Sequence, residues 1–217
     1  MSLRLYSHPF ASFCQKVLIA LYESETPFEA LLIDLADPVD RDALVKLWPI
    51  AKFPVLQDLA RAQTVPESSI IIEYLVQHYP GKTPLIPADP ELARQTRLID
   101  RFYDLHVSDP MQRIVADRLR PTGKEDPFGV ERARASLHIA YGMIEGWAAT
   151  RTWAASDEFS MADCSAAPAL YYANLVLPIG QEHSNARAYL GRLLERPSFA
   201  RVLREAEPFL GLFPKER

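Results

Sequence analysis

Two residue pairs in the first third of the chain have types and positions suited to ligand binding. Glu67 and Ser68 come directly before an apolar helical pattern, and a helix N-terminus presents unpaired amides and the positive end of the helix dipole. The Ser68 amide and hydroxyl could therefore bind a carboxylate, while Glu67 could orient an ammonium group. Phe53 and Pro54 precede a short strand-like run, where the missing proline amide interrupts the ladder of hydrogen bonds. Taken alone, the first pair reads as a helix cap and the second as the start of an edge strand.

Five single residues give further candidates. Ser12 opens the first helical pattern, so its hydroxyl could donate to a ligand or simply cap the helix. Lys52 could bind a carboxylate or be solvated. His8 precedes a proline at the end of a strand-like run and could act as an acid, a base or a pocket contact, or be a turn residue. Tyr103 and His106 are three residues apart in a helical pattern, so we expect them to share a face that lines a pocket or packs in the core.

The cysteines and histidines give little support for disulfide or metal chemistry. Cys14 and Cys164 are too few for a disulfide scaffold. Cys14 shares a helical face with Val17, Leu18 and Leu21, so we expect it to be buried rather than reactive, and we expect the same of Cys164 in its Ala-rich helix. The five histidines are dispersed without a His-x-x-x-His spacing, so we expect no metal site.

The composition is that of an ordinary globular protein. The chain has 217 residues, of which 48% are hydrophobic and 24% charged, and this balance disfavours disorder and coiled coil. The formal charge of -4 gives no excess of Lys and Arg for binding nucleic acid. The longest apolar runs fall short of the roughly 18 residues needed for a membrane span, and no basic region with a long apolar stretch opens the chain. We therefore expect a cytoplasmic protein that contacts neither nucleic acid nor membrane.

Short strand-like runs alternate with helical segments up to about Tyr79, which is typical of an α/β unit. We predict strands over residues 3–6, 30–33, 54–57 and 62–65, the second of them buried. We predict a helix that begins near Ser12, a helix over 41–47, and a third helix that Ser68 or Ser69 caps.

A proline-rich stretch separates this part from an all-helical remainder. Residues 81–90 contain three prolines, which disfavour both helix and central strand. Beyond it we predict helices over 91–119, 130–150, 161–177, 186–195 and 198–206. Pro110 lies inside the first of these and predicts a kink or break. Ser160 and Asp163 have the spacing of a structural capping box.

The order and spacing of these motifs resemble those of the cytosolic glutathione transferases, and the similarity covers essentially the whole chain. Its parts are Leu5-Tyr6-Ser7-His8-Pro9 through Val17-Leu18-Ile19-Ala20-Leu21, Phe53-Pro54-Val55-Leu56, Glu67-Ser68 and Phe159-Ser160-Met161-Ala162-Asp163. The opening is most similar to the serine-type, zeta-like and theta-like branches. The resemblance implies a thioredoxin-like domain over 1–80, a linker over 81–90, an all-helical domain over 91–217 that lines an electrophile pocket, and a homodimer.

The resemblance also implies roles for the candidate residues. Ser68 would bind the γ-glutamyl carboxylate of glutathione and Glu67 its ammonium group. Pro54 would follow a cis peptide bond, leaving the Phe53 backbone free to pair with the cysteinyl backbone of glutathione, as in strand addition. Lys52 would bind the glycyl carboxylate. Tyr103 and His106 would line the electrophile pocket.

One position departs from the family pattern. The serine or cysteine that activates glutathione in the serine and cysteine classes falls on Ala11, which has neither hydroxyl nor thiol. Ser12 is the nearest replacement, since a hydroxyl donated to the sulfur would favour the thiolate. The first-turn amides of the helix, Ser7 or His8 could take the same role.

The sequence therefore predicts a glutathione transferase that adds the glutathione thiolate to a soft electrophile, or uses it in isomerisation or reduction. Glutathione is then a co-substrate, and a small electrophile is the second partner. Two alternatives remain open. One is a glutathione-dependent thioltransferase that uses Cys14, and the other is a transferase-like binding or scaffold protein without turnover.

Overall fold

Four strands between Leu3 and Pro66 form one sheet in the computed structural model, which describes residues 2–216. The strands are β1 (Leu3–Ser7), β2 (Glu29–Leu32), β3 (Val55–Asp58) and β4 (Gln63–Pro66). Their order across the sheet is β2-β1-β3-β4. β1 pairs with β2 in parallel, whereas β3 is antiparallel to both β1 and β4. All four predicted strands are present, each within one residue of its predicted range.

The prediction that the second strand is buried is wrong. β2 lies at an edge of the sheet, next to β1 alone, and Glu29, Ala30 and Leu32 are exposed. Burial begins only at Ile33, directly after the strand. An edge strand has one neighbour in the sheet, so its apolar residues are not all covered.

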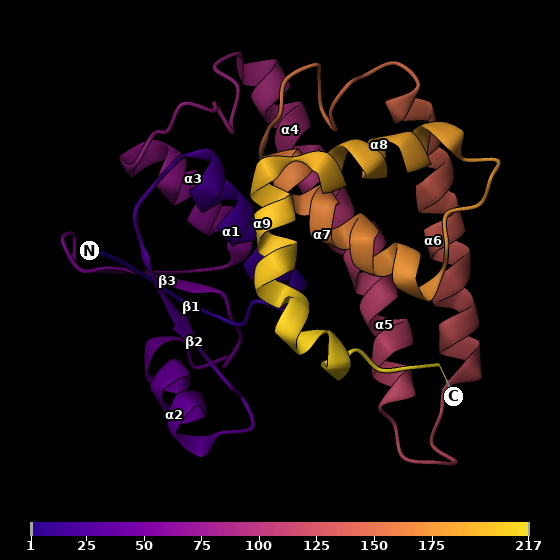
Figure 1. Ribbon diagram of the computed structural model, residues 1–217, viewed down its shortest axis with the longest axis horizontal. Helices are drawn as coiled ribbons and strands as arrows, with labels where there is room; N and C mark the ends of the chain where they lie inside the picture. Colours follow the sequence, from indigo (N-terminus) through magenta and orange to yellow (C-terminus); the bar gives the residue numbers. More distant parts are fainter. Residues whose placement is uncertain (1, 217) are drawn as a thin grey trace.

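Three helices flank the sheet: α1 (Ser12–Glu23), α2 (Pro38–Leu47) and α3 (Ser68–His78). Figure 1 shows α1 and α3 on one side of the sheet and α2 on the other. The predicted apolar face of α1 is confirmed, because Cys14, Val17, Leu18 and Leu21 are all buried. This arrangement is a thioredoxin-like domain.

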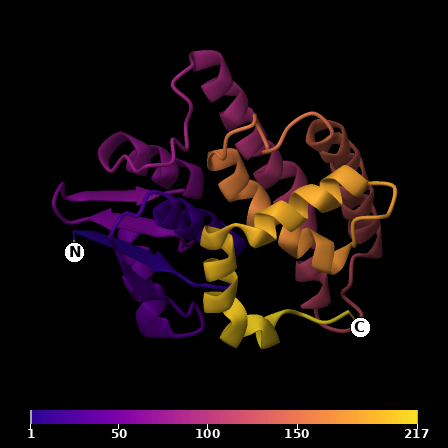
Figure 2. The same ribbon diagram turned by 45° about the horizontal axis from the view of Figure 1, so that its top comes forward.

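The rest of the chain is helical, as predicted. Its elements are α4 (Pro90–Phe102), a π-helical segment η1 (Tyr103–Ser108), α5 (Asp109–Arg118), α6 (Pro127–Ala148), α7 (Met161–Val176), α8 (Ser184–Glu195), α9 (Pro197–Ala206) and a 3-10 segment η2 (Glu207–Leu212). The two views in Figures 1 and 2 show α7 enclosed by the other helices. Small residues such as Ala166, Ala167 and Ala169 are fully buried there and let the neighbours approach closely.

The predicted break near Pro110 is confirmed. A π-helical segment ends at Ser108, and α5 then begins with Pro110 in its first turn, where a missing amide is tolerated. The capping box at the start of α7 is also present, with the Ser160 amide donating to Asp163 Oδ2 at 2.9 Å. Among residues 2–216, no helix is both long and apolar enough to cross a membrane.

Candidate functional site

The sheet register brings three chain turns to one end of the sheet. Val55, the first residue of β3, pairs with Tyr6 near the end of β1 and with Pro66 at the end of β4. The residues just outside these strands therefore lie close together: His8 after β1, Phe53 before β3 and Glu67 after β4. Two of the sequence-predicted pairs, Phe53-Pro54 and Glu67-Ser68, are thus neighbours although they are more than ten residues apart in the chain.

The Phe53–Pro54 peptide bond is cis, as the resemblance implies. Pro54 is buried and Phe53 is half-buried, while Lys52 is exposed on the preceding loop. The strand ladder of β3 starts only at Val55. The Phe53 main chain therefore lies just beyond the paired part of the sheet.

Glu67 has a backbone conformation that favours glycine, with φ 69° and ψ 117°. A residue other than glycine in this region carries roughly 1–3 kcal/mol of strain, which is typical of ligand-binding turns. Glu67 is exposed, whereas Ser68, the first residue of α3, is only 7% exposed. Glu67 occupies the N-cap position and no side chain among the described residues caps this helix, so the prediction that Ser68 or Ser69 caps it is wrong. The Ser68 amide thus lies at an uncapped, positively polarised end of a helix.

A buried ionic cluster holds the start of α3 in place through Ser69. Ser69, next to Ser68, donates its hydroxyl to Asp100 Oδ2 at 2.7 Å and accepts from Lys16 Nζ at 2.8 Å. Lys16 is 1% exposed and makes ion pairs of 2.7 Å to Asp100 and 2.9 Å to Asp104. Lys16 belongs to α1, Asp100 to α4 and Asp104 to η1, so the cluster joins the sheet domain to the helical domain.

Asp104 accepts two further hydrogen bonds, one from α7 and one from α4. Ser165 of α7 donates to Asp104 Oδ1 at 2.8 Å, and Arg101 donates to Asp104 Oδ2 at 3.0 Å. Burial raises the pKa of Asp100, a shift that Lys16 opposes and that Asp104 reinforces. We call Lys16, Ser69, Asp100, Asp104 and Ser165 the interdomain cluster.

The turn between β1 and α1 is held by hydrogen bonds to its main chain. Gln15 Nε2 donates to the Pro9 carbonyl and to the Tyr172 hydroxyl, each at 2.9 Å. That hydroxyl in turn donates to the Phe10 carbonyl at 2.9 Å. Because Tyr172 lies in α7, the helical domain positions this turn.

Ser12 is the first residue of α1 and not its cap. The cap position is taken by Ala11, in an extended conformation, and it has no side-chain cap bond. The Ser12 side chain is half-buried and has no hydrogen-bond partner among residues 2–216. The alternative of Ser12 as a plain N-cap is therefore wrong, and its hydroxyl is available to a ligand.

Tyr103 and His106 do not share a face, contrary to the prediction. Tyr103 is 1% exposed and packs in the helical core beside Tyr189, where burial raises the pKa of its hydroxyl. His106 is exposed and lies 5.5 Å from Phe102, measured between ring centroids. Both residues belong to the π-helical segment η1, whose wider turn means that residues three apart no longer lie one above the other.

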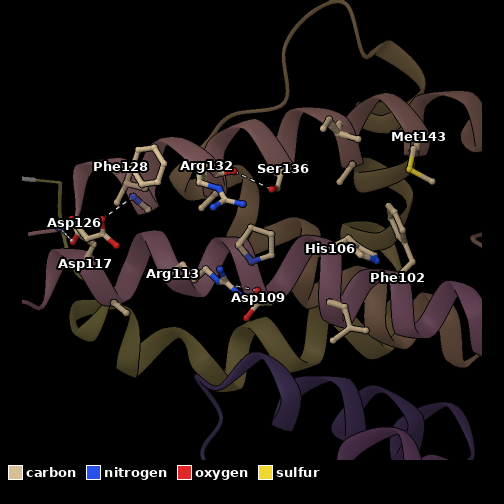
Figure 3. A pocket seen from close by; sticks show the side chains of 18 of the residues that line it. Phe102, His106, Asp109, Arg113, Asp117, Asp126, Phe128, Arg132, Ser136 and Met143 are labelled. Atoms are coloured by element: carbon tan, nitrogen blue, oxygen red, sulfur yellow. Dashed lines mark hydrogen bonds and ion pairs between the residues drawn. The ribbon is translucent and has the colours of Figure 1, made fainter.

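His106 faces a groove between α5 and α6, shown in Figure 3. The groove has a cavity volume of about 1140 Å³ and is lined by residues of both charges, among them Asp109, Arg113 and Arg132. None of its lining residues comes from the first 97 residues of the chain. The groove is therefore separate from the end of the sheet where Phe53 and Glu67 meet.

The cysteines are inert and no metal cluster is present in residues 2–216. Cys14 and Cys164 are fully buried and free, as predicted, and burial raises the pKa of the Cys14 thiol to about 12. Within the same residues, no group of three or more His, Cys, Asp or Glu side chains could hold a metal ion.

The fold agrees with comparisons to known families. Residues 5–83 match the model of the glutathione S-transferase N-terminal domain, and residues 127–192 match that of the glutathione S-transferase C-terminal domain. This chain belongs to the glutathione S-transferase family.

Relatives within and around this glutathione S-transferase family carry two kinds of name. Stringent starvation protein A homolog of Haemophilus ducreyi is 30% identical over 209 residues, which cover 94% of this chain and 87% of that protein. Glutathione S-transferase GstB of Escherichia coli is 24% identical over 191 residues, covering 87% and 91%. A crystal structure of a glutathione S-transferase from Methylobacillus flagellatus with glutathione bound has a TM-score of 0.84 and 25% identity, covering 93% of this chain and 98% of that one.

Sequence reasoning missed the aromatic residues that the C-terminal segment brings to the β1–α1 turn of this glutathione S-transferase. Phe209 packs edge-on against His8 with ring centroids 4.7 Å apart, and Phe213 lies 6.2 Å from Phe10. Residues 207–216, which we call the C-terminal strap, follow α9 and appear in yellow in Figure 1. No periodicity or spacing signals these contacts, because the partners are about 200 residues apart.

Proposed function

We propose that this protein is a glutathione transferase that binds glutathione at the end of the sheet and adds its thiolate to a soft electrophile, or uses it in isomerisation or reduction. The observation that carries the proposal is the meeting of the Phe53-Pro54 and Glu67-Ser68 turns through the β1, β3 and β4 register. The similar Methylobacillus enzyme with glutathione bound supports it.

Each charged group of the tripeptide would bind a group of opposite charge or polarity. The Ser68 amide and hydroxyl would bind the γ-glutamyl carboxylate at the N-terminus of α3, where the helix dipole favours an anion. The exposed Glu67 carboxylate would bind the ammonium group. The Phe53 backbone would pair with the cysteinyl backbone, and Lys52 would bind the glycyl carboxylate.

Chemistry would proceed without a covalent enzyme intermediate. The thiol proton leaves to solvent, and the thiolate then forms a bond to the electrophilic carbon of the second substrate. The site contributes orientation and electrostatic stabilisation of the thiolate at the β1–α1 turn. Ser12 and the first-turn amides of α1 are candidate donors, since the Ser12 hydroxyl lacks a protein partner in the described residues.

The electrophile pocket would lie beside the same turn. Phe10, Tyr172 and Phe213 form a set of aromatic contacts there, with Tyr172 and Phe213 stacked at 6.0 Å. Aromatic side chains suit an apolar second substrate. These residues replace Tyr103 and His106, which lie elsewhere.

A binding protein without turnover is the second candidate function. Ala11 stands where an activating residue is expected, and a 30%-identical relative is named a stringent starvation protein A homolog. In that case glutathione binding or a scaffold role would be retained without catalysis.

The thioltransferase alternative finds no support in the geometry. It requires attack by the Cys14 sulfur, yet this sulfur is fully buried and its thiol pKa is raised to about 12. The thiolate is the nucleophile in such exchange, so Cys14 would be almost wholly unreactive near neutral pH.

We further propose a homodimer of two-domain chains, each with a glutathione-binding domain over 1–80, a linker over 81–90 and a helical domain over 91–217. Exposed apolar residues from α4, η1 and α6 lie along the groove between α5 and α6 and form an apolar face: Leu98, Leu105, Ile139 and Met143. The same groove carries acidic and basic side chains that a second copy could meet with opposite charge. A cytoplasmic location remains a prediction.

Calorimetric titration with glutathione, followed by a turnover assay with a panel of electrophiles, tests these functions. A transferase binds glutathione at millimolar concentration or below and consumes it with at least one electrophile. Binding without any turnover would favour the non-catalytic candidate, and absence of binding would reject both glutathione-dependent functions.

A further inference from the structure

His8 is held in one tautomer by the turn that follows β1. Its carbonyl accepts the Ala11 amide at 3.0 Å, which closes a turn with Pro9 in second position. Within that turn the Phe10 amide donates to His8 Nδ1 at 3.2 Å. A neutral imidazole has one N–H donor and one acceptor, so acceptance at Nδ1 places the proton on Nε2.

The His8 ring lies between two phenylalanines from distant parts of the chain. It stacks on Phe53 with ring centroids 6.3 Å apart, and Phe209 of the C-terminal strap meets it edge-on at 4.7 Å. Within the described residues, Nε2 of His8 has no hydrogen-bond or ion-pair partner. The ring thus carries an uncommitted donor between two apolar side chains.

The two phenylalanines relate the His8 ring to the proposed glutathione site. Phe53 is the residue whose backbone would pair with the cysteinyl part of the tripeptide, so the ring stacked on it is close to where the sulfur would lie. Phe209 covers the ring from the strap. The strap itself is anchored, since Arg118 donates to the Pro214 carbonyl at 3.0 Å.

We propose that His8 stabilises the glutathione thiolate by donating its Nε2 hydrogen to the sulfur. It would thereby take the role of the serine or cysteine that is expected at position 11, where this chain has Ala11. This assignment rests on the proposed function. The thiol proton leaves to solvent, His8 keeps its own proton, and the thiolate sulfur then forms the new bond to the electrophile. Apolar neighbours strengthen such a hydrogen bond, because they exclude competing water.

The electrostatic surroundings of His8 are consistent with a neutral ring at neutral pH. Burial lowers the pKa of His8, and the carboxylate of Asp34, after β2, opposes this shift. Lys52 and Glu207 are the charged residues adjacent in sequence to Phe53 and at the start of η2, and both are exposed.

The test follows the ultraviolet absorbance of the bound thiolate against pH, together with calorimetric glutathione affinity. His8→Phe keeps the ring packing but removes the donor, so the pKa of bound glutathione should rise by about one unit, a tenfold loss of thiolate at pH values below it. Affinity measured at a pH where the thiol is protonated should change by less than about twofold. His138→Phe, on an exposed face of α6, is the matched control and should leave the titration unchanged.

Ser12→Ala separates His8 from its rival. We expect a smaller rise in thiol pKa for Ser12→Ala than for His8→Phe, and the reverse order would overturn the assignment. An unchanged titration in His8→Phe with normal glutathione binding would also overturn it while leaving the proposed function intact. Failure of the wild type to bind glutathione would reject both.

A measurement on the unmodified protein covers the case in which His8→Phe does not fold. Nitrogen-15 NMR should show a protonated, pyrrole-type Nε2 for His8 near neutral pH, with a shift on addition of glutathione that S-methylglutathione does not reproduce. A proton on Nδ1 instead, or equal shifts with both peptides, would contradict the proposal.

Discussion

At the scale of single residues, the candidate site depends on the residues of each turn and equally on neighbours from distant parts of the chain. Glu67 and Ser68 could be proposed as binding residues from the sequence because an acid and a hydroxyl at the start of a helix are a local signal. The role that we propose for His8 could not be chosen from the sequence, because its tautomer and its neighbours Phe53 and Phe209 depend on three separate parts of the fold. The sequence showed that Ala11 lacks an activating hydroxyl or thiol, but not which other residue could donate a hydrogen bond to the thiolate.

Ser68→Ala should weaken glutathione binding by roughly tenfold or more, because a hydrogen bond to a charged group contributes about 1.5–3 kcal/mol. Calorimetric titration measures the change. Ser136→Ala, on an exposed part of α6, is the matched control and should bind as the wild type does. Equal affinities for the wild type and Ser68→Ala would contradict the proposal that Ser68 of α3 binds the γ-glutamyl carboxylate.

At the scale of secondary-structure elements, hydrophobic periodicity predicted the strands and helices to within a few residues at most ends. Periodicity failed to predict burial and side-chain facing where these depend on the tertiary position of the element. β2 is exposed because it is an edge strand, and the π-helical turn of η1 separates Tyr103 from His106. Neither the order of strands nor the widened turn is encoded in a local pattern of apolar residues.

Asp163→Ala should destabilise the protein by about 1–3 kcal/mol while leaving glutathione binding intact. Asp163 accepts hydrogen bonds from the Ser160 amide, the Ala154 amide and the Tyr189 hydroxyl, and its loss leaves these buried donors unpaired. Guanidinium unfolding monitored by circular dichroism measures the free energy of unfolding. A variant with wild-type stability but impaired turnover would mean that this capping box has a catalytic role.

At the scale of the whole molecule, the two domains are joined by charged side chains as well as by apolar packing. Glu23 of α1 is paired with Arg196, at 2.6 Å, and accepts the Ser198 hydroxyl at 2.6 Å. The interdomain cluster also starts from α1, at Lys16, but reaches α4, η1 and α7 instead. The sequence predicted two domains but not these links, because their partners are 31 to 175 residues apart and no local pattern connects them.

The Glu23 link should make stability depend on acid pH. Burial opposes ionisation of Glu23, but hydrogen bonds from Arg196 and Ser198 outweigh it and lower its pKa. A lowered carboxyl pKa contributes stability that is present above the unfolded value of about 4.3 and is lost as the pH falls through the folded value. Glu23→Gln should therefore cost about 1–3 kcal/mol at neutral pH, and the difference from wild type should shrink below about pH 4. Guanidinium unfolding at several pH values measures it, and a difference independent of pH would contradict this origin.

The proposed homodimer predicts that Leu105→Glu, in the exposed apolar face, shifts the mass in solution from two chains to one. A charge introduced there would have to be buried against the partner without a counter-charge. Sedimentation equilibrium measures the mass. Leu210→Glu changes a comparably exposed leucine outside that face and should remain dimeric. A wild-type protein that sediments as a single chain would refute the dimer.

The interdomain cluster has a consequence for attempts to divide this protein. An isolated fragment ending near residue 80 would retain Lys16 and Ser69 but lose both carboxylates that neutralise the ammonium group. The same fragment would expose the side of α3 that faces the helical domain, so the turn at Ser68, where we propose that glutathione binds, would lose its support. Fusion proteins that use the sheet domain alone as a binding domain should therefore also include α4 and η1.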